Sequence, residues 1–247
     1  MMKKRILLPI IAAAAALVLL FVGITTAYFT EVEVRDNNIT IGKVDITLDE
    51  GGFDQDTTYP VVPGTKLSKA PKITNTGNQD EYVFMRITVP TATVTLLNES
   101  GENKGSPIGL TGPQQLFKLI SAESTTNTSV PAQSGKDIEF TYKSGSAENY
   151  GWVLLETDSK TGYDEYVFGY NKKLAPTDET VTLFDEVQLK SFIDNEKKGS
   201  ANIGVYCYGI QAKNLQPSGT YDLTETYLST NTLNAIYTIV KNKAGLS

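Results

Sequence analysis

The segment Tyr82-Val83-Phe84-Met85-Arg86-Ile87-Thr88-Val89 decides the fold class of this chain. Its alternate residues Val83, Met85, Ile87 and Val89 follow the two-residue period of a β-strand. Further strand candidates are Ile39–Ile41, Val44–Leu48, Thr91–Leu97, Lys136–Lys143, Gly151–Glu156, Tyr163–Tyr170, Val181–Leu189 and Ala201–Ala212. Loops rich in Gly, Asn, Ser and Pro separate them. The pattern predicts an all-β fold, a jelly-roll-like antiparallel β-sandwich.

Two segments have helical patterns. Near the C-terminus four apolar residues lie at the spacing of one helix face: Leu233, Ile236, Tyr237 and Val240. Thr230 or Asn231 is the expected N-cap of this short C-terminal helix. We expect it to cover an edge or an end of the sandwich, and a partner-binding helix is the alternative. Gln114–Ile120 is the candidate for one short inserted helix.

Composition excludes several classes of function. The 247 residues include 22 Lys and Arg, 28 Asp and Glu, one Cys and no His. Without His, neither a Ser-His-Asp relay nor an HExxH zinc site can be built. The acidic balance argues against nucleic acid as a partner. Cys207 has no second cysteine to pair with in the same chain, and we interpret it as a buried strand residue.

The first 27 residues have the pattern of a signal peptide. Lys3-Lys4-Arg5 precede the uncharged run Ile6–Ile24, and small residues at Thr25 and Ala27 predict cleavage before Tyr28. An uncleaved membrane anchor is the alternative, because the run is close to the about 20 residues that span a bilayer. Cleavage would remove three basic residues and leave 19 Lys and Arg against 28 Asp and Glu, a net charge of −9.

Carboxylate and tyrosine clusters are the remaining site candidates. Asp49, Asp54 and Asp56 are weak candidates for a Ca²⁺ site, and a solvated acidic loop is the favoured interpretation. We therefore expect no catalytic residue, no metal and no cofactor. The tyrosines of Tyr163–Tyr170 are typical of a strand, while an exposed tyrosine stripe would indicate a carbohydrate-binding or adhesive module.

Several motifs resemble the TasA/camelysin family, whose members are exported with a SipW-type signal peptide. The motifs follow one another along the chain as Ala27–Thr30, Ile41–Leu48, Val62–Leu67, Ile73–Gly77, Leu174–Thr180, Leu183–Val187 and Tyr208–Ala212. Glu31 and Lys43 depart from residues that are common in the family. Camelysin-like relatives carry a metallopeptidase label, so a peptidase is the less favoured alternative.

The resemblance implies a structural subunit of an extracellular fibre in the biofilm matrix of a Gram-positive bacterium. The N-terminal strand of one subunit would insert into the sheet of the next, giving a head-to-tail homopolymer. The candidate donor strand is Tyr28-Phe29-Thr30-Glu31-Val32-Glu33-Val34, within a segment 28–36 between the signal peptide and a single domain 37–247. Further expected partners are a SipW-type signal peptidase and an anchor or accessory matrix protein. The expected location is the extracellular matrix or cell surface, with a membrane tether before cleavage.

Overall fold

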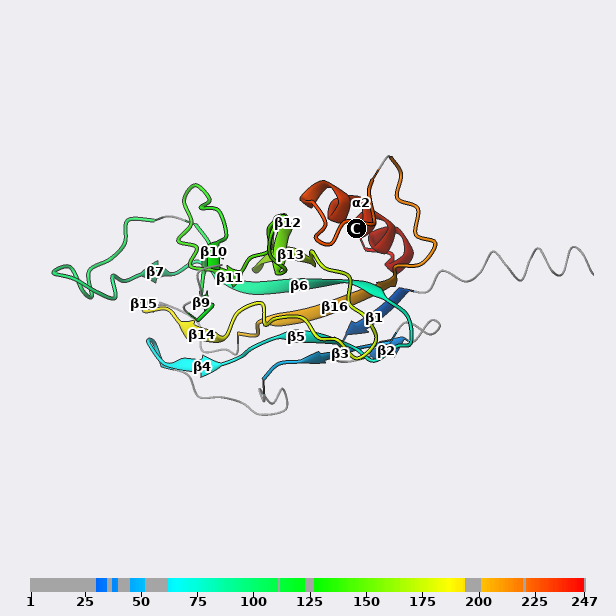
Figure 1. Cartoon of the computed structure of the whole chain (residues 1–247). Helices are drawn as coiled ribbons and strands as arrows, with labels where there is room; N and C mark the ends of the chain where they lie inside the picture. The colour runs from blue at the N-terminus through cyan, green and yellow to red at the C-terminus, as the bar shows by residue number, and fades with distance from the viewer. Residues whose placement is uncertain are drawn as a thin grey trace, which may run out of the picture.

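The computed structural model describes residues 30–34, 37–39, 45–51, 62–110, 112–122, 127–193, 201–219 and 221–246. These residues form an antiparallel β-sandwich with a C-terminal helix (Figure 1). The predicted all-β fold is therefore confirmed. The predicted signal peptide, residues 1–27, lies outside the described residues, and the predicted domain boundaries stay predictions.

The larger layer is one antiparallel sheet. Its strands, in spatial order, are β12 (Trp152–Lys160), β13 (Tyr163–Tyr170), β6 (Glu81–Ala92), β16 (Gly204–Gln211), β1 (Thr30–Val34) and β2 (Asn37–Ile39), and β8 (Gln114–Gln115) pairs with the end of β6. A hairpin joins β12 to β13, with Thr161 and Gly162 in its turn. Gly162 has φ +91°, a conformation that favours glycine. In the spatial order of this sheet, the N-terminal strand β1 lies next to β16.

The second layer consists of shorter antiparallel ladders. They are β3 (Ile46–Asp49) with β5 (Lys72–Asn75); β4 (Lys66–Ser68) with β14 (Glu186–Leu189) and β9 (Phe117–Ile120); β10 (Asn127–Ser129) with β11 (Thr141–Lys143); and β15 (Phe192–Ile193) with β7 (Thr95–Leu96). An isolated bridge between Leu119 and Phe140 connects β9 to the start of β11.

The main core lies between the two layers. Val83, Met85, Ile87 and Val89 of β6 are all fully buried in it. Aromatic rings from both layers join them, and the ring of Phe140 packs edge-on against Tyr166 at a centroid distance of 5.3 Å. The alternation in the opening segment is thus explained by burial on one face.

A second core lies on the opposite face of the larger sheet, beneath helix α2 (Thr230–Ala244) (Figure 1). Leu233, Ile236, Tyr237 and Val240 are buried there, as their spacing predicted. The expectation that the helix covers an edge or an end is wrong, because it covers a face. Tyr82 and Phe84 point to this second face of β6 and create an apolar surface that needs a cover.

The ends of α2 have standard caps. The N-cap is Ser229 rather than Thr230 or Asn231, and its side chain accepts a hydrogen bond from the Thr232 N–H at 3.2 Å. Gly245 ends the helix with φ +66°. None of the helices in the described ranges is long and apolar enough to cross a bilayer.

The predicted inserted helix at Gln114–Ile120 is wrong, because this segment forms β8 and β9. Phe117 and Leu119 are buried, while Lys118 between them is half-buried, so the segment follows a two-residue period. The buried Gln115 donates hydrogen bonds to Asp164 at 2.8 Å and to the Tyr166 hydroxyl at 2.5 Å. Tertiary partners therefore override the local helical pattern.

Candidate assembly interface

The described part of the predicted donor strand, β1, lies in the larger sheet of its own chain. Its antiparallel ladder with β16 pairs Thr30 with Ile210, Glu31 with Gly209, Val32 with Tyr208 and Glu33 with Cys207. On its other side β1 pairs with β2, from Val32 opposite Ile39 to Val34 opposite Asn37. The cleavage-site residues Thr25, Ala27 and Tyr28, together with Phe29, lie outside the described residues. Their roles, and the role of β1 between chains, stay predictions.

The side chains of β16 alternate between the two cores. Cys207 is fully buried in the core between the layers, as the sequence predicted for this cysteine. Tyr208 and Ile210 are fully buried in the core beneath α2, and burial raises the pKa of Tyr208 to about 12. Both faces of β16 are therefore closed, and the side of the strand that remains for pairing is its backbone edge.

At Gly209 the backbone of β16 lies close to the side chains of Glu81 and Ile46. A Cβ atom at this position would lie 3.0 Å from Oε2 of Glu81 and 3.1 Å from Cγ2 of Ile46 in β3. Glu81 is fully buried, and its Oε1 accepts a hydrogen bond from the Asp45 N–H at 3.3 Å. A side chain at Gly209 would therefore push β16 away from β3. Sequence reasoning did not identify Gly209 or Glu81, although a glycine inside a strand pattern is a signal of such an approach.

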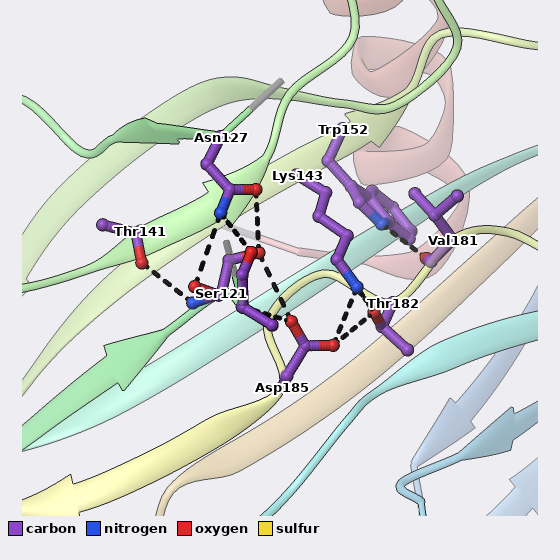
Figure 2. A network of polar contacts seen from close by, with 9 residues as sticks. Ser121, Asn127, Thr141, Lys143, Trp152, Val181, Thr182 and Asp185 are labelled. Carbon is purple, nitrogen blue, oxygen red and sulfur yellow. Dashed lines mark hydrogen bonds and ion pairs between the residues drawn. The ribbon is translucent and has the colours of Figure 1, made fainter. Parts of the chain in front are cut away.

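A separate polar network connects the ends of β9, β10 and β11 to the segment before β14, and Figure 2 shows it. Lys143 donates to Oδ1 of Asp185 at 2.8 Å and to the Thr182 hydroxyl at 2.5 Å. The Ala122 N–H donates to the other carboxylate oxygen of Asp185 at 2.5 Å. Burial opposes ionisation of Asp185, but its hydrogen bonds with Lys143, Ala122 and Thr182 lower its pKa. The carboxylate therefore stays ionised near neutral pH.

The same network contains a serine near a lysine, which is a pairing that some hydrolases use. The Ser121 hydroxyl donates to Oδ1 of Asn127 at 3.0 Å, and its N–H donates to the Thr141 hydroxyl at 2.8 Å (Figure 2). The side-chain nitrogen of Lys143 is already paired with the Asp185 carboxylate and the Thr182 hydroxyl. The geometry supports a structural role for this network, which connects neighbouring strands and is called the polar clasp below.

Two hollows in the surface are lined by paired charges. In the larger, of about 210 Å³, Lys118 contacts Glu99 at 2.7 Å and Glu139 at 2.8 Å, and Lys190 contacts Asp137 at 3.0 Å. Burial opposes the charge on Lys118, but the hydrogen bonds that it donates to Glu139 and Glu99 raise its pKa. The smaller hollow, of about 130 Å³, lies between α2 and the sheet. In the larger hollow these pairs satisfy the charges without a ligand.

The weak metal candidates do not gather in the described residues. Asp49 is exposed, accepts the Gly51 N–H at 2.9 Å and lies 3.8 Å from the Lys72 ammonium. Asp54 and Asp56 lie outside the described residues. Glu50, next in the chain, forms a buried ion pair with Lys69 at 2.5 Å.

Two of the three tyrosines in Tyr163–Tyr170 are core residues. Tyr166 and Tyr170 are buried, and burial raises the pKa of each to about 12. Tyr163 is half-buried. This segment therefore presents no exposed stripe of tyrosines, and its predicted role as an ordinary strand is confirmed.

Comparison with known proteins gives one match. The family model described as camelysin metallo-endopeptidase matches residues 1–111, and the predicted resemblance to the TasA/camelysin family is confirmed over this range. No curated protein and no solved structure matches the chain. The matched range includes β1 and β2, β3 behind them, and β6.

The description of the family implies a metal-dependent peptidase centre. The chain has no His, and within the described ranges no group of three or more Cys, Asp or Glu residues could hold a metal ion. These residues therefore do not fit such a centre, and no peptidase step can be derived from them. The expectation that the chain is not an enzyme stays a prediction.

Proposed function

Since residues 1–111 carry the match to the camelysin family, we propose that this chain is an exported structural subunit of an extracellular fibre in the biofilm matrix. The subunit would polymerise head to tail, with its N-terminal strand placed in the sheet of the next copy. A SipW-type signal peptidase would release the strand, and an anchor or accessory matrix protein would hold the fibre at the cell surface. The net acidic charge is unfavourable for binding nucleic acid.

The observation that carries this proposal is the place of β1. The strand comes first among the described elements, and it completes the edge of β16 through backbone pairing. The next strand after the β1–β2 pair, β3, belongs to the other layer. Removal of β1 would thus expose the N–H and C=O groups of β16 without interrupting the chain of the sandwich, and an equivalent strand from a second copy could satisfy them.

The same geometry predicts open-ended growth. The donated element and the β16 edge are different surfaces of one subunit, so their contact between copies is heterologous. Such contacts propagate into a filament unless they close into a ring. Each added copy would cover one edge and present another.

Electron microscopy tests the proposal. We expect filaments from concentrated residues 28–247 and none from residues 35–247, which lack Tyr28–Val34. A second control replaces residues 28–34 by a Gly and Ser segment of equal length, which keeps the length of the chain but weakens strand formation. Monodisperse particles from residues 28–247 under all conditions would overturn the proposal.

A further inference from the structure

We infer that the side chains of Lys136 and Gln115 become joined by an isopeptide bond in the folded chain, with the loss of ammonia. The amine of Lys136 replaces the nitrogen of the Gln115 side-chain amide. Asp164 is the catalytic residue, because its carboxylate contacts both reacting groups. The inference goes beyond the proposed function and does not depend on it.

The carboxylate of Asp164 places the two reacting groups side by side. Its Oδ1 accepts a hydrogen bond from the Lys136 ammonium, and its Oδ2 accepts one from Nε2 of Gln115 at 2.8 Å. Lys136 also donates to the Ser159 hydroxyl at 2.8 Å. Asp164 and Gln115 are fully buried, so their contact is shielded from bulk water. Holding an amine beside an amide in this way converts a slow bimolecular reaction into an intramolecular one.

The backbone on both sides of Lys136 is fixed to strand β8, which carries Gln115. The preceding residue of β8, Gln114, has a fully buried side chain. Its Nε2 donates to the Gly135 carbonyl at 2.8 Å, and its Oε1 accepts the Asp137 N–H at 3.1 Å. Lys136 lies between these two contacts and therefore approaches the Gln115 amide from a fixed position.

The amide of Gln115 has donors available for its oxygen. Oε1 is buried and has no hydrogen-bond partner among the described residues, while Nε2 contacts Asp164 and the Tyr166 hydroxyl. A half turn of the terminal amide exchanges the oxygen and the nitrogen. Oε1 then faces the Tyr166 hydroxyl, whose pKa burial raises to about 12, and the protonated form of Asp164. Two such donors stabilise the negative charge that develops on the oxygen when an amine attacks.

The reaction begins with transfer of a proton from Lys136 to Asp164, which leaves a neutral amine. The lone pair of Nζ attacks Cδ of Gln115, and the electron pair of the C=O bond moves onto Oε1. The bond from Cδ to Nε2 then breaks as Asp164 donates its proton to Nε2 and takes one from Nζ. The released ammonia carries that proton away as ammonium, so Asp164 ends ionised. One C–N bond forms and one breaks, and no further reactant is needed.

The bond would give the sandwich a covalent link between two of its segments. It would close a loop of residues 115–136, which contains β9 and β10, and would hold β8 to the segment before β11. A cross-link of this kind restricts the unfolded chain in the way that a disulfide does. The chain has a single cysteine, so it cannot form an intrachain disulfide for the same purpose.

Peptide mapping of the denatured protein tests the inference. Trypsin cleaves after a free lysine but not after one whose amine is acylated. We expect residues 105–118 linked to residues 119–143, which stay uncleaved at Lys136, with a total mass lower by one ammonia. Fragmentation should place the link at Gln115. Separate peptides of full mass would overturn the inference, and so would a link from Lys136 to Asp164 that has lost water.

Variants separate the bond from the fold. Lys136→Arg keeps a cation beside Asp164 but has no amine to acylate, and Asp164→Asn removes the acid while leaving both reacting side chains. After allowance for the substitution, we expect the intact mass of each variant to exceed that of the wild type by one ammonia. Lys104→Arg, in an exposed loop, is the matched control and should keep the wild-type loss. The bond in full yield in Asp164→Asn would overturn the catalytic role. The peptide map of the wild type decides the inference even if a variant fails to fold.

Discussion

The two edges of the larger sheet differ in how they are closed. At one edge, β12 has a register shift between Leu154 and Glu156, and its exposed end carries Asp158 and Lys160. Lys241 of α2 forms an ion pair with Glu156 on the same strand. Bulges and charges are features that discourage the pairing of edge strands. At the other edge, β16 is closed by the N-terminal hairpin through backbone pairing.

This difference indicates which edge can assemble. An irregular, charged edge such as β12 resists the addition of a strand, while a regular edge with buried side chains favours it. A subunit with one guarded edge and one edge that accepts a strand would form single filaments and not broad sheets. The following experiments change one of the two edges or, in one case, a site away from both.

The largest effect is expected from a covalent lock on the β16 edge. Glu33→Cys introduces a thiol opposite Cys207, because the β1–β16 ladder pairs these positions. Opposed positions in such a ladder lie within the range of a disulfide. We expect the oxidised monomer to form no filaments and reduction to restore them. Filaments assembled in reductant and then oxidised should give covalent multimers on a non-reducing gel.

Glu33→Ser is the control for this lock, because it removes the same carboxylate without adding a thiol. It should assemble equally well with and without oxidant. Filaments from the locked monomer, with its intrachain disulfide verified by mass, would show that a surface other than the β16 edge carries assembly.

The next effect is expected from filling the close approach behind β16. Gly209→Val would place its side chain against Glu81 and Ile46, where a Cβ alone lies 3.0–3.1 Å from both. Overpacking of this kind costs about 1–3 kcal/mol of folding free energy. We expect a lower melting temperature and a loss of filaments even at temperatures where the monomer remains folded.

Gly109→Val is the matched control, because a Cβ there would meet no atom within 4 Å. It should leave both melting temperature and filaments unchanged. Normal filaments from a folded Gly209→Val protein would show that the β16 edge is not the acceptor.

A smaller effect, on stability alone, is expected at the polar clasp, which lies away from both edges. Asp185→Asn removes the charge that accepts hydrogen bonds from Lys143 and Ala122. Loss of hydrogen bonds to a charged group costs about 1–3 kcal/mol. We expect urea denaturation at pH 7 to show this loss and filament formation to continue.

The pH dependence of this loss follows from the lowered pKa of Asp185. A carboxyl whose pKa is lower in the folded state contributes stability above its unfolded pKa, about 3.9, and loses it as the pH falls through the folded value. The difference between wild type and Asp185→Asn should therefore shrink below about pH 4. A difference independent of pH would contradict the ionic role of the clasp.

The sequence patterns predicted individual strands better than the contacts between strands. Tyr163–Tyr170 and the C-terminal helix are present as predicted, because each carries a clear apolar period. The apolar Tyr82 and Phe84 on the second face of β6 could have predicted the position of the helix over the sheet. Gln114–Ile120 forms strands and not the predicted helix, because the side-chain amides of its buried glutamines donate hydrogen bonds to distant residues. The pairing of β16 with β1 joins residues that are far apart in the sequence, and local patterns carry no information on such pairing.

The smallest effect is expected at the guarded edge. Asp158 and Lys160 form an exposed ion pair at 2.6 Å, and the change Asp158→Thr/Lys160→Thr removes both charges without altering the net charge. Threonine favours strands, so the end of β12 would become a neutral, regular edge. We expect an unchanged melting temperature and filaments of normal length that associate side by side, measured as a greater width in negative stain. Glu102→Thr/Lys104→Thr removes one acidic and one basic residue from an exposed loop away from the sheet, and it should leave the filament width unchanged.

If the two double variants give filaments of the same width, then the charges on β12 do not prevent side-by-side association. The bulge between Leu154 and Glu156 is then sufficient by itself.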